Sequence, residues 1–145
     1  MTPGLTTATK TNMMKYFLNV EVAGIPEPTP IFAGLLVDQG GPEPNELIIG
    51  DGNYARASVE FAVVDGTARN TSSITFPKAT NDWTSGTSKI THIAFYTSHY
   101  DEDYEAWVSD TTDSLVAILP LSEAESVKAT ETFQMNPQAV KMQLI

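Results

Sequence analysis

Two histidines and one dense run of carboxylates are the residues of this sequence that could support chemistry. His92 and His99 could supply imidazole groups for proton transfer or metal binding. We interpret His92, which lies in an apolar segment, as a neutral, hydrogen-bonded histidine of the core. His99 opens a loop, where we expect water to solvate it. The spacing of the two histidines favours no metal geometry.

The carboxylates are concentrated in residues 101–105, which read Asp-Glu-Asp-Tyr-Glu. Carboxylate oxygens of this kind can hold Ca²⁺. The run lacks the glycine and the alternating Asp/Asn spacing of an organised calcium loop. We therefore interpret it as a solvated acidic tip, and we expect neither a metal site nor a cofactor.

Catalytic motifs are absent from the sequence. It contains no Gly-x-Ser-x-Gly, no phosphate-binding glycine loop and no cysteine, which excludes thiol catalysis. A hydrolase of surface glycans would need two carboxyl groups facing each other across a cleft, and the sequence gives no sign of such a pair. We expect a binding or structural protein rather than an enzyme.

Composition narrows the possible partners. The formal net charge is −10, with 18 acidic residues and 8 lysines and arginines, so a basic footprint for nucleic acid is not expected. No apolar run approaches the roughly 20 residues of a membrane helix. The N-terminus lacks the apolar stretch of a signal peptide, and there is no cysteine. These features are typical of assembly in a reducing host cytoplasm, away from membranes.

The elements that must position these residues are mostly strands. In residues 54–64, apolar Ala57, Val59 and Phe61 alternate with polar residues, which is the period of a half-buried strand. Residues 90–97 are apolar on both faces, which indicates a central strand. Further strands are predicted at 31–37, 73–76, 115–121, 127–133 and 140–144, with a short one around Trp107 and turns at 65–66, 122–126 and 136–137.

The first thirty residues differ from the rest. Apolar residues recur at helical spacing over about 11–20, which predicts one short helix, and alternating prolines over 26–30 impose an extended path. Together, the pattern predicts an all-β protein: a jelly-roll-like β-sandwich over residues 11–145 as a single domain. Residues 1–10 are rich in threonine, and we expect an extended N-terminal arm that a neighbouring subunit holds.

Several residues are candidates for contacts with a partner. Trp83, Tyr100 and Trp107 lie in or beside loops, where aromatic side chains can anchor an interface or, equally, plug the end of a sandwich. The arm offers the second candidate set, in which backbone hydrogen bonds would strap it to a neighbour. The candidate partner-binding residues of the arm are Thr2, Pro3, Leu5, Thr7 and Lys10.

The order of several motifs resembles a family of small virion proteins of tailed phages, often labelled tail fibre proteins. The motifs are a glycine-led Tyr-x-Arg at 52–56, an Asn-containing turn at 70–71, Phe-Pro-x-Ala-Thr-x-x-Trp at 76–83 and a Thr-His strand at 91–95. The resemblance spans residues 11–145. Residues 98–103 depart from the family pattern of an Asp and a Gly-Gly turn after the histidine strand, and Asn136-Pro137 stands where a glycine turn is expected.

The resemblance implies a structural component of the virion. Because the chain has no repeats or heptads for a fibre stalk, we expect a capsid decoration (cement) protein on the capsid exterior, which bridges subunits of the major capsid protein and stabilises the shell. It would also associate with itself, as a trimer rather than a dimer. The alternative is a tail fibre or baseplate component that contacts the host surface through its exposed aromatic residues.

Tyr54 and Arg56 stand together at the beginning of a predicted strand. Arg56 could stack on an aromatic ring or pair with a carboxylate of a partner. We favour a structural role, in which Arg56 clamps the loop at 65–70 or the loop at 80–88.

Overall fold

A computed structural model describes residues 30–38 and 44–143 of the chain. The predicted arm at 1–10, the predicted helix at about 11–20 and most of the proline-rich segment lie outside the described residues, as do the candidate residues Thr2, Pro3, Leu5, Thr7 and Lys10. The described residues form antiparallel strands and one short 3-10 turn, which confirms the all-β class. They contain no helix that is long and apolar enough to cross a membrane.

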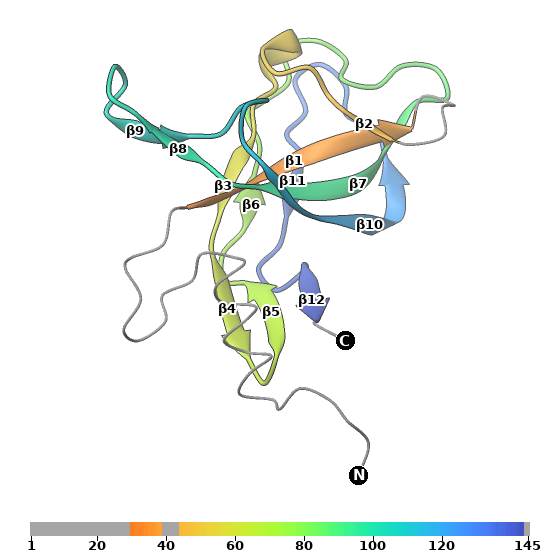
Figure 1. The fold of residues 1–145 in the computed structure, drawn as a ribbon. Helices are drawn as coiled ribbons and strands as arrows, with labels where there is room; N and C mark the ends of the chain where they lie inside the picture. Colours follow the sequence, from red (N-terminus) through yellow and green to blue (C-terminus); the bar gives the residue numbers. More distant parts are fainter. Residues whose placement is uncertain (1–29, 39–43, 144–145) are drawn as a thin grey trace.

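The largest sheet has β7 at its centre, paired with β1 on one side and β10 on the other (Figure 1). β2 and β3 both pair with β1. Smaller pairings join β4, β5 and β12, then β6 with β11, then β8 with β9. The strands are β1 Ile31–Asp38, β2 Asn45–Glu46, β3 Ala57–Val59, β4 Phe61–Val64, β5 Thr67–Asn70, β6 Ile74–Thr75, β7 Lys89–Tyr96, β8 His99–Asp101, β9 Ala106–Val108, β10 Leu115–Glu125, β11 Gln134–Met135 and β12 Lys141–Gln143.

The central position predicted for residues 90–97 is confirmed, because β7 pairs on both sides. Ile93 and Phe95 are almost fully buried and join a cluster that also contains Leu35 of β1 and Ile74 of β6. Aromatic rings also pack edge to face in this core: the ring centroids of Phe61 and Phe95 are 5.2 Å apart, with an angle of 75° between the ring planes. The main apolar cluster thus joins residues of the large sheet to residues of β4, β5, β6 and β12, and a smaller cluster contains Leu36, Ala94 and Tyr96. The jelly-roll connectivity itself stays a prediction.

Some predicted elements are wrong in detail. The predicted turn at 122–126 belongs to β10, which runs to Glu125, and the strand predicted at 127–133 is a loop. Val127 is buried, but its backbone N–H donates to the hydroxyl of Thr84 and its carbonyl accepts from the N–H of Trp83. The apolar side chain of Val127 therefore packs a loop against the core, and the apolar pattern of this segment does not mark a strand.

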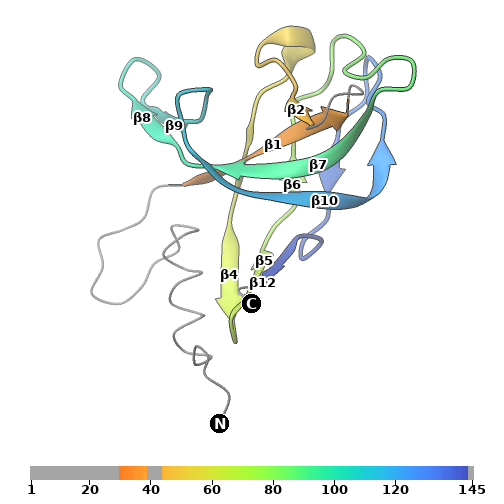
Figure 2. The same ribbon diagram turned by 45° about the vertical axis from the view of Figure 1, so that its right-hand side comes forward.

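Two hairpins leave the main body of the protein (Figures 1 and 2). One joins β4 to β5 through Asp65 and Gly66, which have φ angles of 52° and 77°. Both positive angles are typical of a two-residue type I′ turn, for which Asp-Gly is a favoured sequence. The other hairpin joins β8 to β9 and carries the acidic run at 101–105.

Candidate interaction surfaces

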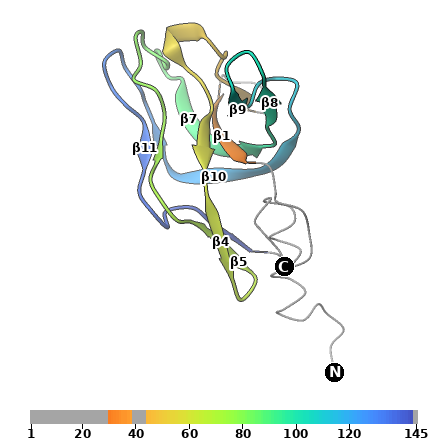
Figure 3. The same ribbon diagram turned by 90° about the vertical axis from the view of Figure 1, so that its left-hand side faces the viewer.

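The β8–β9 hairpin presents three aromatic side chains to solvent. Tyr100 and Trp107 are direct cross-strand partners, and their rings meet edge to face at 5.6 Å and 69°. They remain 49% and 41% exposed, while Tyr104 at the tip is 78% exposed. Figures 1 to 3 show the hairpin projecting from the large sheet. Two of the predicted contact residues therefore lie together on an accessible element.

The turn of this hairpin is rich in carboxylates. Asp101 faces Ala106 at the end of the ladder, and its carboxylate accepts a hydrogen bond of 2.9 Å from the backbone N–H of Asp103. Glu105 has a φ of 50°, in the left-handed region, where the chain reverses direction. The acidic run is thus the tight turn of the hairpin, and its charges stand beside the exposed rings.

Trp83, the third predicted contact aromatic, lies on a different part of the protein. Its indole N–H donates to the carbonyl of Gly52 at 2.8 Å, and its ring meets Tyr54 edge to face at 5.4 Å. It is half-buried. Trp83 therefore closes the 51–53 turn over the core and does not join the aromatic surface of the hairpin.

Arg56 is held by a carboxylate and an aromatic ring inside the protein. Its guanidinium makes two hydrogen bonds to Glu46, from Nε to Oε2 at 2.9 Å and from Nη2 to Oε1 at 2.7 Å. It also lies 3.4 Å from the centroid of the Tyr96 ring. Tyr54 donates its hydroxyl proton to Glu46 at 2.7 Å and accepts from the backbone N–H of Leu35 at 2.9 Å. The structural role favoured for Tyr54 and Arg56 agrees with these contacts.

The loop that Arg56 holds is not one of the two expected. Its Nη1 donates to the hydroxyl of Ser109, at 3.0 Å, and to the carbonyl of Asp110. Ser109 in turn donates to the carbonyl of Thr97, which precedes β8. The prediction that Arg56 clamps residues 65–70 or 80–88 is therefore wrong. The sequence could not identify this loop because more than fifty residues separate it from Arg56.

Electrostatics keep this cluster charged at Arg56 and neutral at the two tyrosines. Burial, and then the charge of Glu46, raise the pKa values of Tyr54 and Tyr96 above that of a free phenol. Burial acts to lower the pKa of Arg56, but hydrogen bonds and attraction from Glu46 outweigh it and raise that pKa. Burial and the neighbouring carboxylate of Glu46 together keep the two tyrosines neutral, and Glu46 keeps Arg56 charged.

His99 forms a second tie at the base of the hairpin. Its Nδ1 lies 3.0 Å from Oδ2 of Asp113, whose side chain is only 7% exposed. Nε2 lies 3.9 Å from Oδ2 of Asp110. Hydrogen bonds from the hydroxyl and backbone N–H of Thr112 lower the pKa of Asp110. His99 is 42% exposed to water, in agreement with the expected solvation, and it also has two carboxylate neighbours that the sequence did not identify.

His99, Asp110 and Asp113 could also hold a metal ion, because one donor atom from each lies within 4.8 Å of the donor atoms of the other two. The sequence pattern does not reveal this group of His99, Asp110 and Asp113, because it indicates the strand before Asp110 only approximately. His92 lies elsewhere, half-buried on β7, where its Nδ1 is 2.8 Å from the hydroxyl of Thr91. It is hydrogen-bonded as predicted but is not part of the core.

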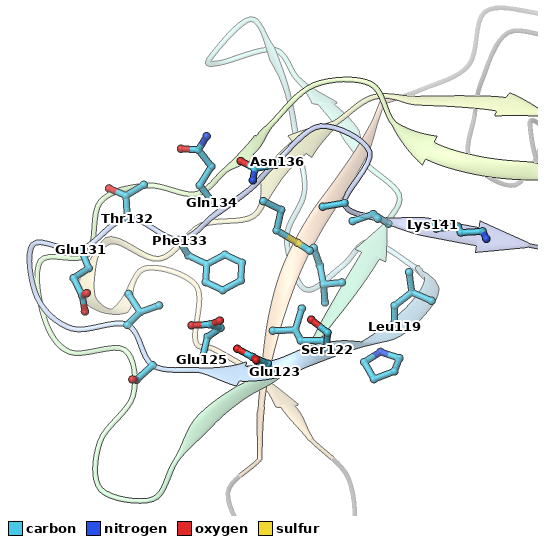
Figure 4. Close-up of a pocket in the computed structure, with 18 residues that line it drawn as sticks. Leu119, Ser122, Glu123, Glu125, Glu131, Thr132, Phe133, Gln134, Asn136 and Lys141 are labelled. Atoms are coloured by element: carbon cyan, nitrogen blue, oxygen red, sulfur yellow. The ribbon is translucent and has the colours of Figure 1, made fainter.

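A groove of about 720 Å³ lies between β10 and the segment that leads into β11 (Figure 4). Glu123 and Glu125 project from β10, the Phe133 ring lies across from them, and Glu131 stands at one end. Lys141 lies at the other end. This groove gathers three carboxylates that the sequence did not place together. All three are exposed to water, and together they give this part of the groove a negative charge that can attract a cation.

A comparison with protein-family models finds a match for this chain. A family model described as Podophage GP4 fiber I protein gp80 matches residues 4–143 of the chain. The matched range includes the hairpin, the Arg56 cluster and the groove. No curated protein matches the chain.

Proposed function

The chain belongs to the family described as podophage GP4 fiber I protein gp80, and it is therefore a structural component of a phage virion. We propose that it serves in a tail fibre and that it contacts the host cell surface through the β8–β9 hairpin. The prediction of a small phage virion protein family is confirmed. The expected role as a capsid cement gains no support from the match, and the alternative that the sequence analysis named fits the family description better.

The observation that carries this proposal is the exposure of paired aromatic rings on a projecting, anchored hairpin. Aromatic side chains bury large areas at little entropic cost, which makes them frequent anchors of interfaces. Tyr100 and Trp107 brace each other, and Arg56 and His99 hold the two sides of the hairpin base. A surface held in this way loses little conformational freedom when it binds.

Competition for adsorption tests the proposal. The purified full-length chain should slow adsorption of the phage to its host, and a variant with Tyr100→Ser, Tyr104→Ser and Trp107→Ser should compete at least about tenfold less well. The matched control replaces two exposed apolar residues outside the hairpin, Ile48→Ser and Val64→Ser, and should compete like the wild type. Circular dichroism checks that each variant is folded. Equal competition by the triple variant would exclude the hairpin as the contact surface.

Location on the particle separates the fibre from the cement role. Gold-labelled antibody against the chain should decorate the tail region of intact virions. Label spread over the head would instead support capsid decoration and would overturn the fibre proposal.

A further inference from the structure

The groove beside β10 lies between two strands that each have a free side. Within residues 30–38 and 44–143, β10 pairs only with β7, and β11 pairs only with β6. Residues from both strands line the groove. A free strand edge presents N–H and C=O groups that can pair with an added strand. The groove therefore offers backbone partners as well as side chains.

The side chains of the groove divide into an apolar floor and an acidic rim. Leu119, Leu121 and Phe133 are half-buried and pack against the core, so part of each apolar surface remains available. Glu123 and Glu125 belong to the rim and are exposed. In an extended partner strand, alternate side chains point to opposite sides. One set of its side chains could therefore contact the apolar floor while the other set contacts the acidic rim.

Charge identifies the kind of strand that fits. Three glutamates and one lysine line the groove, which leaves it negative. The whole chain carries a formal net charge of −10, so a second copy would approach this rim against electrostatic repulsion. A partner segment with lysine or arginine would instead be attracted.

We propose that the groove binds an extended segment of another virion protein, in which apolar residues alternate with lysine or arginine, as a strand added to the free edge of β10. Figures 1 to 3 show the end of β10 on the side of the molecule away from the β8–β9 hairpin. The groove thus attaches the protein to the particle and leaves the hairpin free. This inference goes beyond host contact and does not depend on it.

Synthetic peptides test the proposal with the full-length chain. The probe is a short fluorescent peptide of alternating valine and lysine, and its two controls replace lysine by glutamate or carry N-methyl groups on alternate backbone nitrogens. We expect binding of the lysine peptide by fluorescence anisotropy, weakened by salt, with both controls at least about tenfold weaker. Shifts of backbone amide signals should map to β10.

Substitutions locate the site. Glu123→Gln with Glu125→Gln should weaken binding of the lysine peptide by about tenfold, while the matched pair Glu60→Gln with Asp65→Asn, both exposed elsewhere, should leave it unchanged. Absence of lysine-peptide binding, equal binding of either control peptide, equal loss with both pairs of substitutions, or amide shifts away from β10 would each overturn the proposal. Adsorption competition by the hairpin is a separate readout, so the two proposals can fail independently.

Discussion

Removing the guanidinium of Arg56 would leave the carboxylate of Glu46 partly buried without its bidentate partner. The two side chains are only 3% and 14% exposed, so water can replace little of what is lost. We expect Arg56→Met to lower the free energy of unfolding by about 3 kcal/mol in chemical denaturation. Arg69→Met, on the exposed face of β5, should change it by less than about 0.5 kcal/mol.

A double variant that also replaces Glu46 distinguishes the contribution of the ion pair to stability from the contribution of side-chain packing. Because an unpaired buried charge is the main cost, Arg56→Met with Glu46→Met should recover part of the lost stability. If the double variant is as unstable as the sum of the two single variants, the pair contributes nothing by its charges.

Tyr54 gives the protein a distinctive response to alkaline pH. Its pKa is raised in the folded state, so above about pH 10 the unfolded chain loses a phenol proton that the folded chain keeps. Stability from this group is complete below that pH and falls above it, by about 1.4 kcal/mol per pH unit. Tyr54→Phe should be less stable at neutral pH but should show a shallower decline between pH 10 and 11. The difference in slope between this variant and the wild type measures the contribution of Tyr54.

Most motif residues that carried the family resemblance have structural roles. Asn70 is fully buried and bonds the backbones of Ser72, Asn136 and Val140, which ties β5 to the segment before β12. Phe76 packs in the core. These roles depend on contacts across many residues, so the sequence identified the positions without revealing what they touch.

At the scale of elements, β1 approaches the Arg56 cluster so closely that only glycine fits at position 34. A Cβ there would lie 2.5 Å from Oε2 of Glu46 and 2.8 Å from Cε2 of Tyr96. We expect Gly34→Ala to lower the free energy of unfolding by about 1–3 kcal/mol. Glu46→Ala removes the nearest atom, so a double variant should lose less than the sum of the two single changes. Strict additivity in thermal unfolding would contradict this explanation.

The strands that sequence alone predicted well are those whose pattern reflects a single environment. β1 and the second half of β7, from Ile93 to Tyr96, are buried on both faces and have apolar residues at successive positions. Ala57, Val59 and Phe61 alternate with exposed residues because only one face of their strands is covered. β5 was missed although Asp65-Gly66 signals a hairpin, because Thr67–Asn70 contains an arginine and an asparagine. The asparagine is buried only because distant backbone groups satisfy it.

The same limit applies to the candidate surfaces. Tyr100 and Trp107 were recognised as aromatic residues near loops, but their pairing depends on a hairpin register that the acidic run at 101–105 does not reveal. The groove could not be predicted, because Glu123 and Glu125 were assigned to a turn and Phe133 to a strand. A wrong assignment of strand or loop also assigns the wrong direction to the side chain, so the three residues were not expected to line one groove.

At the scale of the whole molecule, the β8–β9 hairpin follows the Tyr96 end of β7, whereas Glu125 of the groove pairs with Ile90 near the opposite end of that strand. The two proposed partners would therefore approach different ends of the large sheet. Phage carrying Tyr104→Ser and Trp107→Ser should contain normal amounts of the protein but adsorb at least about tenfold more slowly. Phage carrying Glu123→Gln and Glu125→Gln should contain less of it. Quantitative immunoblots of purified virions measure content, and unadsorbed plaque counts measure adsorption. If either pair of substitutions changes both quantities equally, the two surfaces do not act separately.

The chain has two tryptophans, and the fold places them in different surroundings. Trp107 stands on the hairpin with 41% of its surface exposed, while Trp83 is half-buried with its indole N–H bonded to Gly52. Iodide should therefore quench the emission of the first more readily than that of the second. A Trp83→Phe variant would leave Trp107 as the one tryptophan, and with selective excitation its emission maximum and lifetime would report whether water or a partner covers this face of the hairpin.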